Sequence, residues 1–292
     1  MRAVAAIGLV FLVCRGAFAG EEAENEVYEH LVSTGIAIGD QSIPLPKPAL
    51  SPSDDAKTQD RIVHEIAKKK HGYDDFVRES PVAPFVLVIT PTTNKGGDRV
   101  HVIDTWFVAY GKRSDLSDDD LLGQLMGGGS SEKGKTEQLT DEQLKERDLT
   151  ISSDEQRSES YSHTASPLLN KVQIAGIVHN LTTRTENSTL AASLLDPRFG
   201  DDAKFPNRWR PYETTAGGGK VLGKAHAYAG FGGYSHVVEL TKPAGALFIE
   251  CHMAINEPYG WYKGKDLLRP KLPALMQDNV RTIRRKLMKK KD

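Results

Sequence analysis

Three histidines in the C-terminal third of the sequence have a spacing that could build a metal site. His226, His236 and His252 lie in runs typical of β-strands, and a hairpin turning about Phe231 would place His226 opposite His236. Facing positions of an antiparallel pair bring side chains within about 5 Å of each other. A second hairpin turning about Ala244 would place His252 opposite His236 as well. Three imidazoles with an open fourth position form a catalytic zinc set, so the row indicates a metal-dependent hydrolase as one alternative function.

The histidine row depends on the register of the strands. A shift of the second hairpin by one residue sends His252 to the other face and places Cys251 opposite His236. A chain with nine histidines also produces such alignments by coincidence. Ordinary sheet histidines are therefore the competing interpretation, and it is the one we favour.

The segment 196–212 concentrates charges and aromatic residues between two strand-like runs. Asp196 has an oxygen ligand to offer calcium, and Arg198 and Arg210 are suited to clamping an anion. Mixed charge at this density is also typical of ion pairs that order a loop, with Trp209 packing it down. We favour the structural interpretation, and ligand binding stays open.

Aromatic residues also gather near the predicted turns. Trp261 and Tyr262 follow the last strand-like run, and with Trp209 they could form a platform that stacks on sugar rings. A carbohydrate-binding module is therefore a second alternative. The competing interpretation is that these residues cover the ends of the sheet.

Two segments resemble catalytic or cofactor-binding motifs, but each lacks a feature that its motif requires. Gly233-Tyr-Ser-His-Val237 lacks the second glycine of a nucleophile elbow. Gly217-Gly-Gly-Lys220 lacks the spacing of a phosphate-binding loop. The sequence thus carries no fingerprint of a catalytic site or a cofactor, and we lean toward a protein that is not an enzyme.

The first nineteen residues have the three parts of a cleavable secretory signal. Arg2 provides a positive start, residues 3–13 form an apolar run, and Ala17-Phe18-Ala19 is a small-x-small cleavage site. The run is too short for a membrane span, which needs about 20 apolar residues. We therefore expect a periplasmic or secreted protein, cleaved near Ala19.

Charge and cysteine content restrict the partners and the source of stability. Removing Arg2 and Arg15 from the 38 basic residues leaves 36 against 39 acidic ones, and this balance argues against nucleic acid as a partner. Once Cys14 is removed with the signal, Cys251 is the single cysteine, so no intramolecular disulfide can form. The fold must depend on its hydrophobic core.

The remaining chain reads as one α+β domain over residues 53–292, after an acidic N-terminal segment and proline-rich connector over residues 20–52. Helices are predicted over 21–34, after Ser53 or Asp54, and over the last twenty residues. The predicted strands, each an apolar run bounded by turn residues, are 85–90, 100–110, 171–184, 188–194, 221–228, 234–240 and 246–254. A mobile polar insertion with two short helices, near 118–126 and 140–147, is expected at about 111–165.

Strands in succession with helices at both ends predict an antiparallel sheet of about six to eight strands. The element order resembles helix-grip proteins such as START-like lipid-binding domains, in which a curved sheet grips a long C-terminal helix. The resemblance rests on element order alone. The C-terminal helix ends in a run of lysines and arginines, suited to an anionic envelope or membrane surface. These features together favour an exported binding or structural module without catalysis, whose ligand the sequence does not name.

Overall fold

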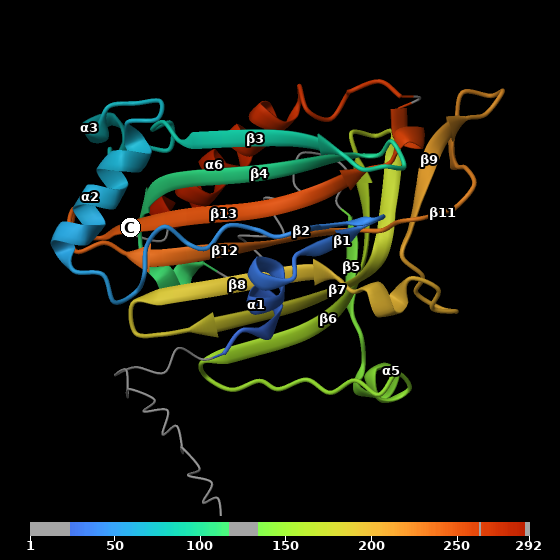
Figure 1. The fold of residues 1–292 in the computed structure, drawn as a ribbon, viewed down its shortest axis with the longest axis horizontal. Coiled ribbons are helices and arrows are strands. Elements are labelled where there is room, and N and C mark those ends of the chain that lie inside the picture. Colours follow the sequence, from blue (N-terminus) through green and yellow to red (C-terminus); the bar gives the residue numbers. More distant parts are fainter. Residues whose placement is uncertain (1–23, 117–133, 263, 290–292) are drawn as a thin grey trace, which may run out of the picture.

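The computed structural model describes residues 24–116, 134–262 and 264–289, and Figure 1 shows their arrangement. The predicted secretory signal and its cleavage site lie outside these residues. Among the described residues, no helix combines the length and the apolar character needed to cross a membrane. The helices are α1 (Glu26–Ser33), α2 (Ala56–Ala67), α3 (Tyr73–Phe76), α5 (Asp141–Lys145) and α6 (Leu272–Lys289).

The strands of the large sheet are β3 (Val86–Thr93), β4 (Arg99–Tyr110), β5 (Lys135–Gln138), β6 (Arg157–Leu168), β7 (Val172–Arg184), β8 (Ser188–Leu195), β9 (Arg208–Thr214), β10 (Lys220–Leu222), β11 (His226–Ala227), β12 (Phe231–Glu239) and β13 (Ala246–Glu257). Eight of them follow the order β10-β9-β7-β8-β12-β13-β4-β3, with β6, β5 and β11 attached beside this path. All neighbours are antiparallel. The chain is therefore the α+β protein with an antiparallel sheet that its sequence predicts.

Strands β4 and β13 are interior strands of the sheet, and both are largely apolar on both faces. They pair over all twelve residues, from Ala246 opposite Tyr110 to Glu257 opposite Arg99. Side chains alternate between the faces, so one face carries Phe107 and the other carries Trp106. A strand that is apolar on both sides must be covered on both sides, and the helices do this.

Strand β7 bends and divides its pairing between two neighbours along one edge. Residues 172–175 pair with β9, whereas residues 178–184 pair with β8. Gly176 lies at the division, where a Cβ would come 2.4 Å from the Asn207 side-chain oxygen. That oxygen accepts from the Ile177 N–H, and the Asn207 amide donates to the Asp196 carbonyl. The sheet turns at this point and carries β9 around the core beneath α6.

Helix α6 covers one face of the sheet and lies behind it in Figure 1. Its residues Met276, Val280, Ile283 and Leu287 follow three-to-four spacing, and all are buried in one core with Phe107 and other side chains of that face. A curved sheet therefore packs on a long C-terminal helix, as the element order predicts.

The N-terminal elements cover the opposite face. Helix α1 and the small hairpin of β1 (Ile36–Ile38) and β2 (Gln41–Ile43) lie in front of the sheet in Figure 1, and α2 and α3 lie toward one end. Leu31 of α1 packs with Tyr234 and Ala254 of the sheet, while Val63 of α2 packs with Phe248. The connector 44–52 runs between these two groups.

The region 111–165 contains more regular structure than a polar insertion would have. The predicted helix near 118–126 lies outside the described part of the chain, as do all of residues 117–133, but β5, α5 and β6 follow them. Helix α5 begins with the capping box of Thr140 and Gln143, which agrees with the predicted short helix. Strand β6 was not predicted, because its polar sequence, rich in Ser and Thr, has no apolar alternation.

Candidate functional site

A buried polar cluster lies on the face covered by the N-terminal elements. Three central strands contribute two residues each, in two rows: Trp106, Glu250 and His236 in one, and Asp104, His252 and Tyr234 in the other. We call these six residues the Glu250 cluster. It lies beneath the proline-rich connector.

Glu250 is fully buried and receives N–H groups from several directions. The Ala49 N–H donates to both carboxylate oxygens, at 3.1 and 2.9 Å, and the Leu50 N–H lies 3.4 Å from Oε1. The Trp106 indole donates to Oε2 at 3.2 Å. Glu250 therefore satisfies two of the few free N–H groups in a connector rich in proline, and holds that connector against the sheet.

The two histidines of the cluster lie close to its carboxylates. His252 lies between Asp104, at 2.7 Å from Nδ1, and Glu250, at 3.4 Å from Nε2. His236 Nδ1 lies 3.5 Å from Glu250 Oε1, an ion-pair distance without hydrogen-bond geometry. The cluster is therefore a chain of alternating carboxylates and imidazoles, and ionisable groups are rarely fully buried unless paired in this way.

The charges in the cluster stabilise each other. Burial opposes ionisation of Glu250, yet its contacts with His236, His252 and the Ala49 N–H lower its pKa to about 2. Burial likewise acts to lower the pKa of His252, but Asp104 and Glu250 outweigh it and raise that pKa. Burial, reinforced by the Glu250 charge, raises the pKa of Tyr234. Because these groups are closed off by the connector, the arrangement serves to fasten the N-terminal segment.

The structure does not bring the three predicted histidines together. His226 lies on β11, opposite Trp209 of β9, and its exposed ring stacks on Trp209 at 4.5 Å. His236 and His252 share a face, but the turn between β12 and β13 is centred on Pro243, not Ala244. Glu250 therefore lies opposite His236, and Tyr234 opposite His252.

The charged residues of the 196–212 loop form internal ion pairs. Arg198 binds Asp196 through Nε at 3.0 Å and also donates to the Tyr161 hydroxyl. Asp196 is buried and caps the short 3-10 helix η2 (Pro197–Phe199). Arg210 is exposed on β9, apart from this pair. The loop is thus ordered by its own charges.

The predicted aromatic platform lies in the core. Trp209 and Trp261 meet edge to face with ring centroids 6.3 Å apart, and both are buried, as is Tyr262. Trp261 and Tyr262 belong to η3 (Tyr259–Tyr262), which covers the end of the sheet. Their rings are not presented to solvent.

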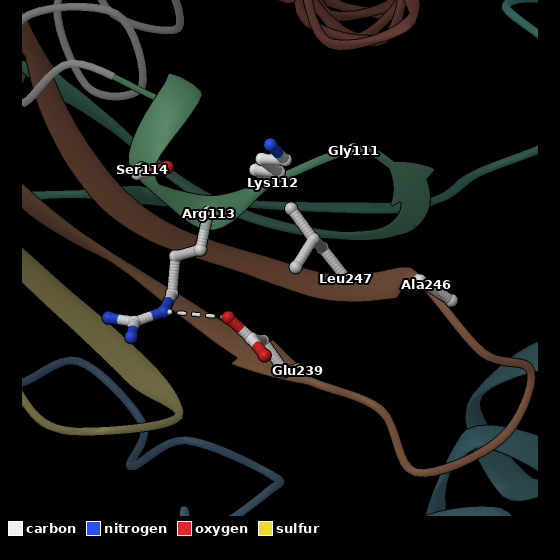
Figure 2. Close-up of a pocket in the computed structure, with 8 residues that line it drawn as sticks. Gly111, Lys112, Arg113, Ser114, Glu239, Ala246 and Leu247 are labelled. Carbon is white, nitrogen blue, oxygen red and sulfur yellow. Dashed lines mark hydrogen bonds and ion pairs between the residues drawn. The ribbon is translucent and has the colours of Figure 1, made fainter. Parts of the chain in front are cut away.

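An open pocket of about 370 Å³ lies at the other end of the sheet, where β4 and β12 end and β13 begins. It is lined by Gly111, Lys112, Arg113, Ser114, Glu239, Gly245, Ala246 and Leu247. Figure 2 shows Arg113 turned away from Lys112 toward Glu239, to which its Nε donates at 3.2 Å. Arg113 also donates to the carbonyls of Thr185, Glu186 and Ser188, so its guanidinium is used within the protein.

The last turns of α6 flank this pocket. Gly111 packs against Leu287 so closely that a Cβ would lie 3.0 Å from the Leu287 Cβ. The exposed cations nearby are Lys112, Arg285, Lys286 and Lys289, which we call the basic end. Lys112, Arg285 and Lys289 have no ion-pair or hydrogen-bond partner within the described ranges. Arg284 is different, because it is buried and donates to the carbonyls of the 83–84 segment and β4.

No protein-family model matches this chain, and no curated protein is similar to it. Its own residues therefore carry the functional argument. Sequence reasoning missed Asp104 and Glu250, although a signal was available: each is a carboxylate inside an otherwise apolar strand run, where an unpaired charge would be costly.

Proposed function

We propose that the chain is an exported, non-catalytic binding module that attaches to an anionic envelope or membrane surface through the basic end. The observation that carries the proposal is a group of exposed cations beside an open pocket, of which Lys112, Arg285 and Lys289 have no partner within the described ranges. Basic residues near an anionic surface contribute about 1 kcal/mol each. The chain as a whole carries a formal charge of −1, so attraction to such a surface must come from a local group of cations.

The buried polar groups support a non-catalytic role. The Glu250 cluster brings together Asp104, His236, Glu250 and His252, and the connector closes it from solvent. The alternative of a hydrolase using His226, His236 and His252 gains no support, since His226 lies on a different strand pair. The alternative of a sugar-binding platform also gains none, because Trp209, Trp261 and Tyr262 are buried.

Vesicle co-sedimentation tests the surface-binding proposal. We expect the chain without its signal to bind vesicles containing anionic phosphatidylglycerol and not neutral phosphatidylcholine vesicles. The triple variant Lys112→Glu, Arg285→Glu, Lys289→Glu should weaken binding at least about 100-fold, because three attractive charges become repulsive. Equal binding by this variant would refute the proposal, and so would equal binding to neutral vesicles.

A matched control reverses the same number of charges elsewhere. Lys57, Lys135 and Lys224 are exposed and lie outside the basic end. Their replacement by glutamate gives the same net charge as the test variant. A comparable loss in this control would mean that net charge, and not the basic end, governs binding.

Export itself is tested by the intact mass of protein purified from its native cells. Cleavage after Ala19 gives a chain that starts at Gly20. A chain that retains Met1 and stays in the cytoplasm would contradict export.

A further inference from the structure

A second polar group, on the α6 side of the sheet, combines donor types suited to a metal ion. His101 on β4, Glu257 on β13 and Asp266 in the loop before α6 each have one ligand atom within 4.8 Å of the other two. Within the described ranges no other three His, Cys, Asp or Glu side chains meet this criterion. This group is separate from the Glu250 cluster and from the basic end.

Two of the three donors are preorganised by burial. The His101 and Glu257 side chains are 0% and 1% exposed, and His101 Nε2 lies 2.7 Å from Glu257 Oε2. Arg99 holds the other oxygen, Oε1, at 3.2 Å and donates to the Gly264 carbonyl. The guanidinium therefore fixes the carboxylate and leaves Oε2 directed toward His101.

Unsatisfied buried atoms occur on His101 itself and in η3, the segment that follows β13. His101 Nδ1, the Tyr262 hydroxyl and the Trp261 indole nitrogen are buried and have no hydrogen-bond partner among the described residues. Tyr262 lies close enough to Glu257 for the carboxylate charge to raise its pKa, after the larger effect of burial. Buried polar atoms are normally satisfied, so an unsatisfied group of three calls for a further ligand or water.

We propose that His101, Glu257 and Asp266 bind a divalent transition-metal ion such as Zn²⁺. An imidazole with two carboxylates matches the ligands of zinc, whereas calcium and magnesium prefer oxygen ligands alone. Asp266 is 31% exposed, so the ion enters from its side. The ion joins the ends of β4 and β13 to the loop that leads into α6.

Small movements complete the coordination. Ligand atoms on a tetrahedral zinc lie about 3.3 Å apart, because each is about 2.0 Å from the metal. The contact of 2.7 Å between His101 and Glu257 must therefore lengthen, and the deprotonated Nε2 faces the ion. Asp266 must turn inward from Arg269, which it contacts at 3.3 Å on the surface.

Calorimetric titration of the chelator-treated chain with Zn²⁺ tests the site, together with thermal unfolding. We expect one ion per chain and a rise in the unfolding temperature of at least about 4 °C with Zn²⁺ at 100 times its Kd. Asp266→Asn should weaken binding at least about tenfold, since even groups that only support metal ligands contribute that much. Asp266 lies on a partly exposed loop, so this variant retains the fold, which circular dichroism verifies.

The controls separate this site from other sources of binding. Asp278→Asn makes the same substitution at an exposed position of α6, and His226→Gln removes the most accessible of the three histidines in the predicted row. Both should keep the affinity of the unmodified chain. The proposal would be overturned if the chain showed no saturable Zn²⁺ binding, or if Asp266→Asn bound Zn²⁺ as tightly as the unmodified chain. His101, Glu257 and Asp266 would then be a group of ion pairs without a metal. Loss of binding in His226→Gln would also overturn it, by placing the ion elsewhere.

Discussion

Replacing Glu250 with glutamine tests whether the Glu250 cluster fastens the connector to the sheet. The carboxylate receives four N–H groups, from Ala49, Leu50, Trp106 and His252. Glutamine has the same shape but only one acceptor oxygen. With that oxygen in the place of Oε2, three contacts persist, and the new NH₂ group faces the Leu50 N–H.

The size of the effect follows from the change in acceptor charge. A hydrogen bond to a charged group contributes about 1.5–3 kcal/mol, and one between neutral groups about 1 kcal/mol. Three bonds that each lose about 1 kcal/mol lower the free energy of unfolding by about 3 kcal/mol. Urea unfolding at about pH 6, where Glu250 and His252 are both charged, measures this difference. Amide exchange of Ala49 and Leu50 should accelerate as the connector loosens.

An exposed glutamate provides the control. Glu65 pairs with Arg61 on the surface of α2, with its side chain 61% exposed, so Glu65→Gln should change the free energy of unfolding by less than about 0.5 kcal/mol. If Glu250→Gln has an equally small effect and amide protection is unchanged, the carboxylate does not hold the connector.

Four further predictions concern buried groups. The pKa of His252 is raised in the folded state, so its contribution to the free energy of unfolding is complete below about pH 6.5 and is lost as pH rises through the folded pKa. Asp104→Asn should make the free energy of unfolding fall less steeply with pH, as measured by urea unfolding from about pH 6 to 8.5. At the acid end, the stabilisation from Glu250 is present above its ordinary pKa of 4.5 and disappears as pH falls toward about 2, which acid unfolding followed by tryptophan fluorescence detects. Arg284→Met should lower the free energy of unfolding, measured with urea, by about 3–5 kcal/mol, because three backbone carbonyls lose their hydrogen-bond donor. A loss below about 1 kcal/mol would show that these carbonyls do not depend on Arg284. Cys251 is buried and burial raises its pKa, so a maleimide should label it only after denaturation, and rapid labelling of the native chain would contradict its burial.

Strong periodic signals predicted much of the fold. The run at 100–110 is apolar on both faces and forms the interior strand β4, and the three-to-four spacing after Leu272 forms α6. The runs at 171–184 and 188–194 became β7 and β8 with boundaries shifted by one residue. In each case the local pattern and the tertiary packing favour the same structure.

The predicted turn before β12 is wrong because two of its glycines belong to the strand. The glycines of 230–233 predict a turn about Phe231, but Gly232 and Gly233 lie within β12. A Cβ on Gly233 would come 2.7 Å from the His252 carbonyl oxygen, so glycine is needed there for close approach of two strands. Without that turn, the residues before it are free to pair with β9, which accounts for the position of His226.

The polar clusters depend on contacts that no local pattern reveals. Glu250 meets the connector about 200 positions earlier in the chain, and His101 meets Glu257 across 156 positions. The alternation of side chains indicates which residues share a face, but the register across three strands decides which of them meet. The sequence predicted that His236 and His252 share a face, and only the strand register identifies their acidic partners.

The position of β13 has a consequence for the order in which the molecule can assemble during synthesis. This strand is nearly the last to leave the ribosome, yet it lies between β4, made early, and β12. Until β13 emerges, β3 and β4 cannot pair with the other strands of the sheet. The connector also lacks Glu250, which accepts its N–H groups. Nascent chains shorter than this length would hold two separate half-sheets with unpaired edges, and they would depend on chaperones to avoid association.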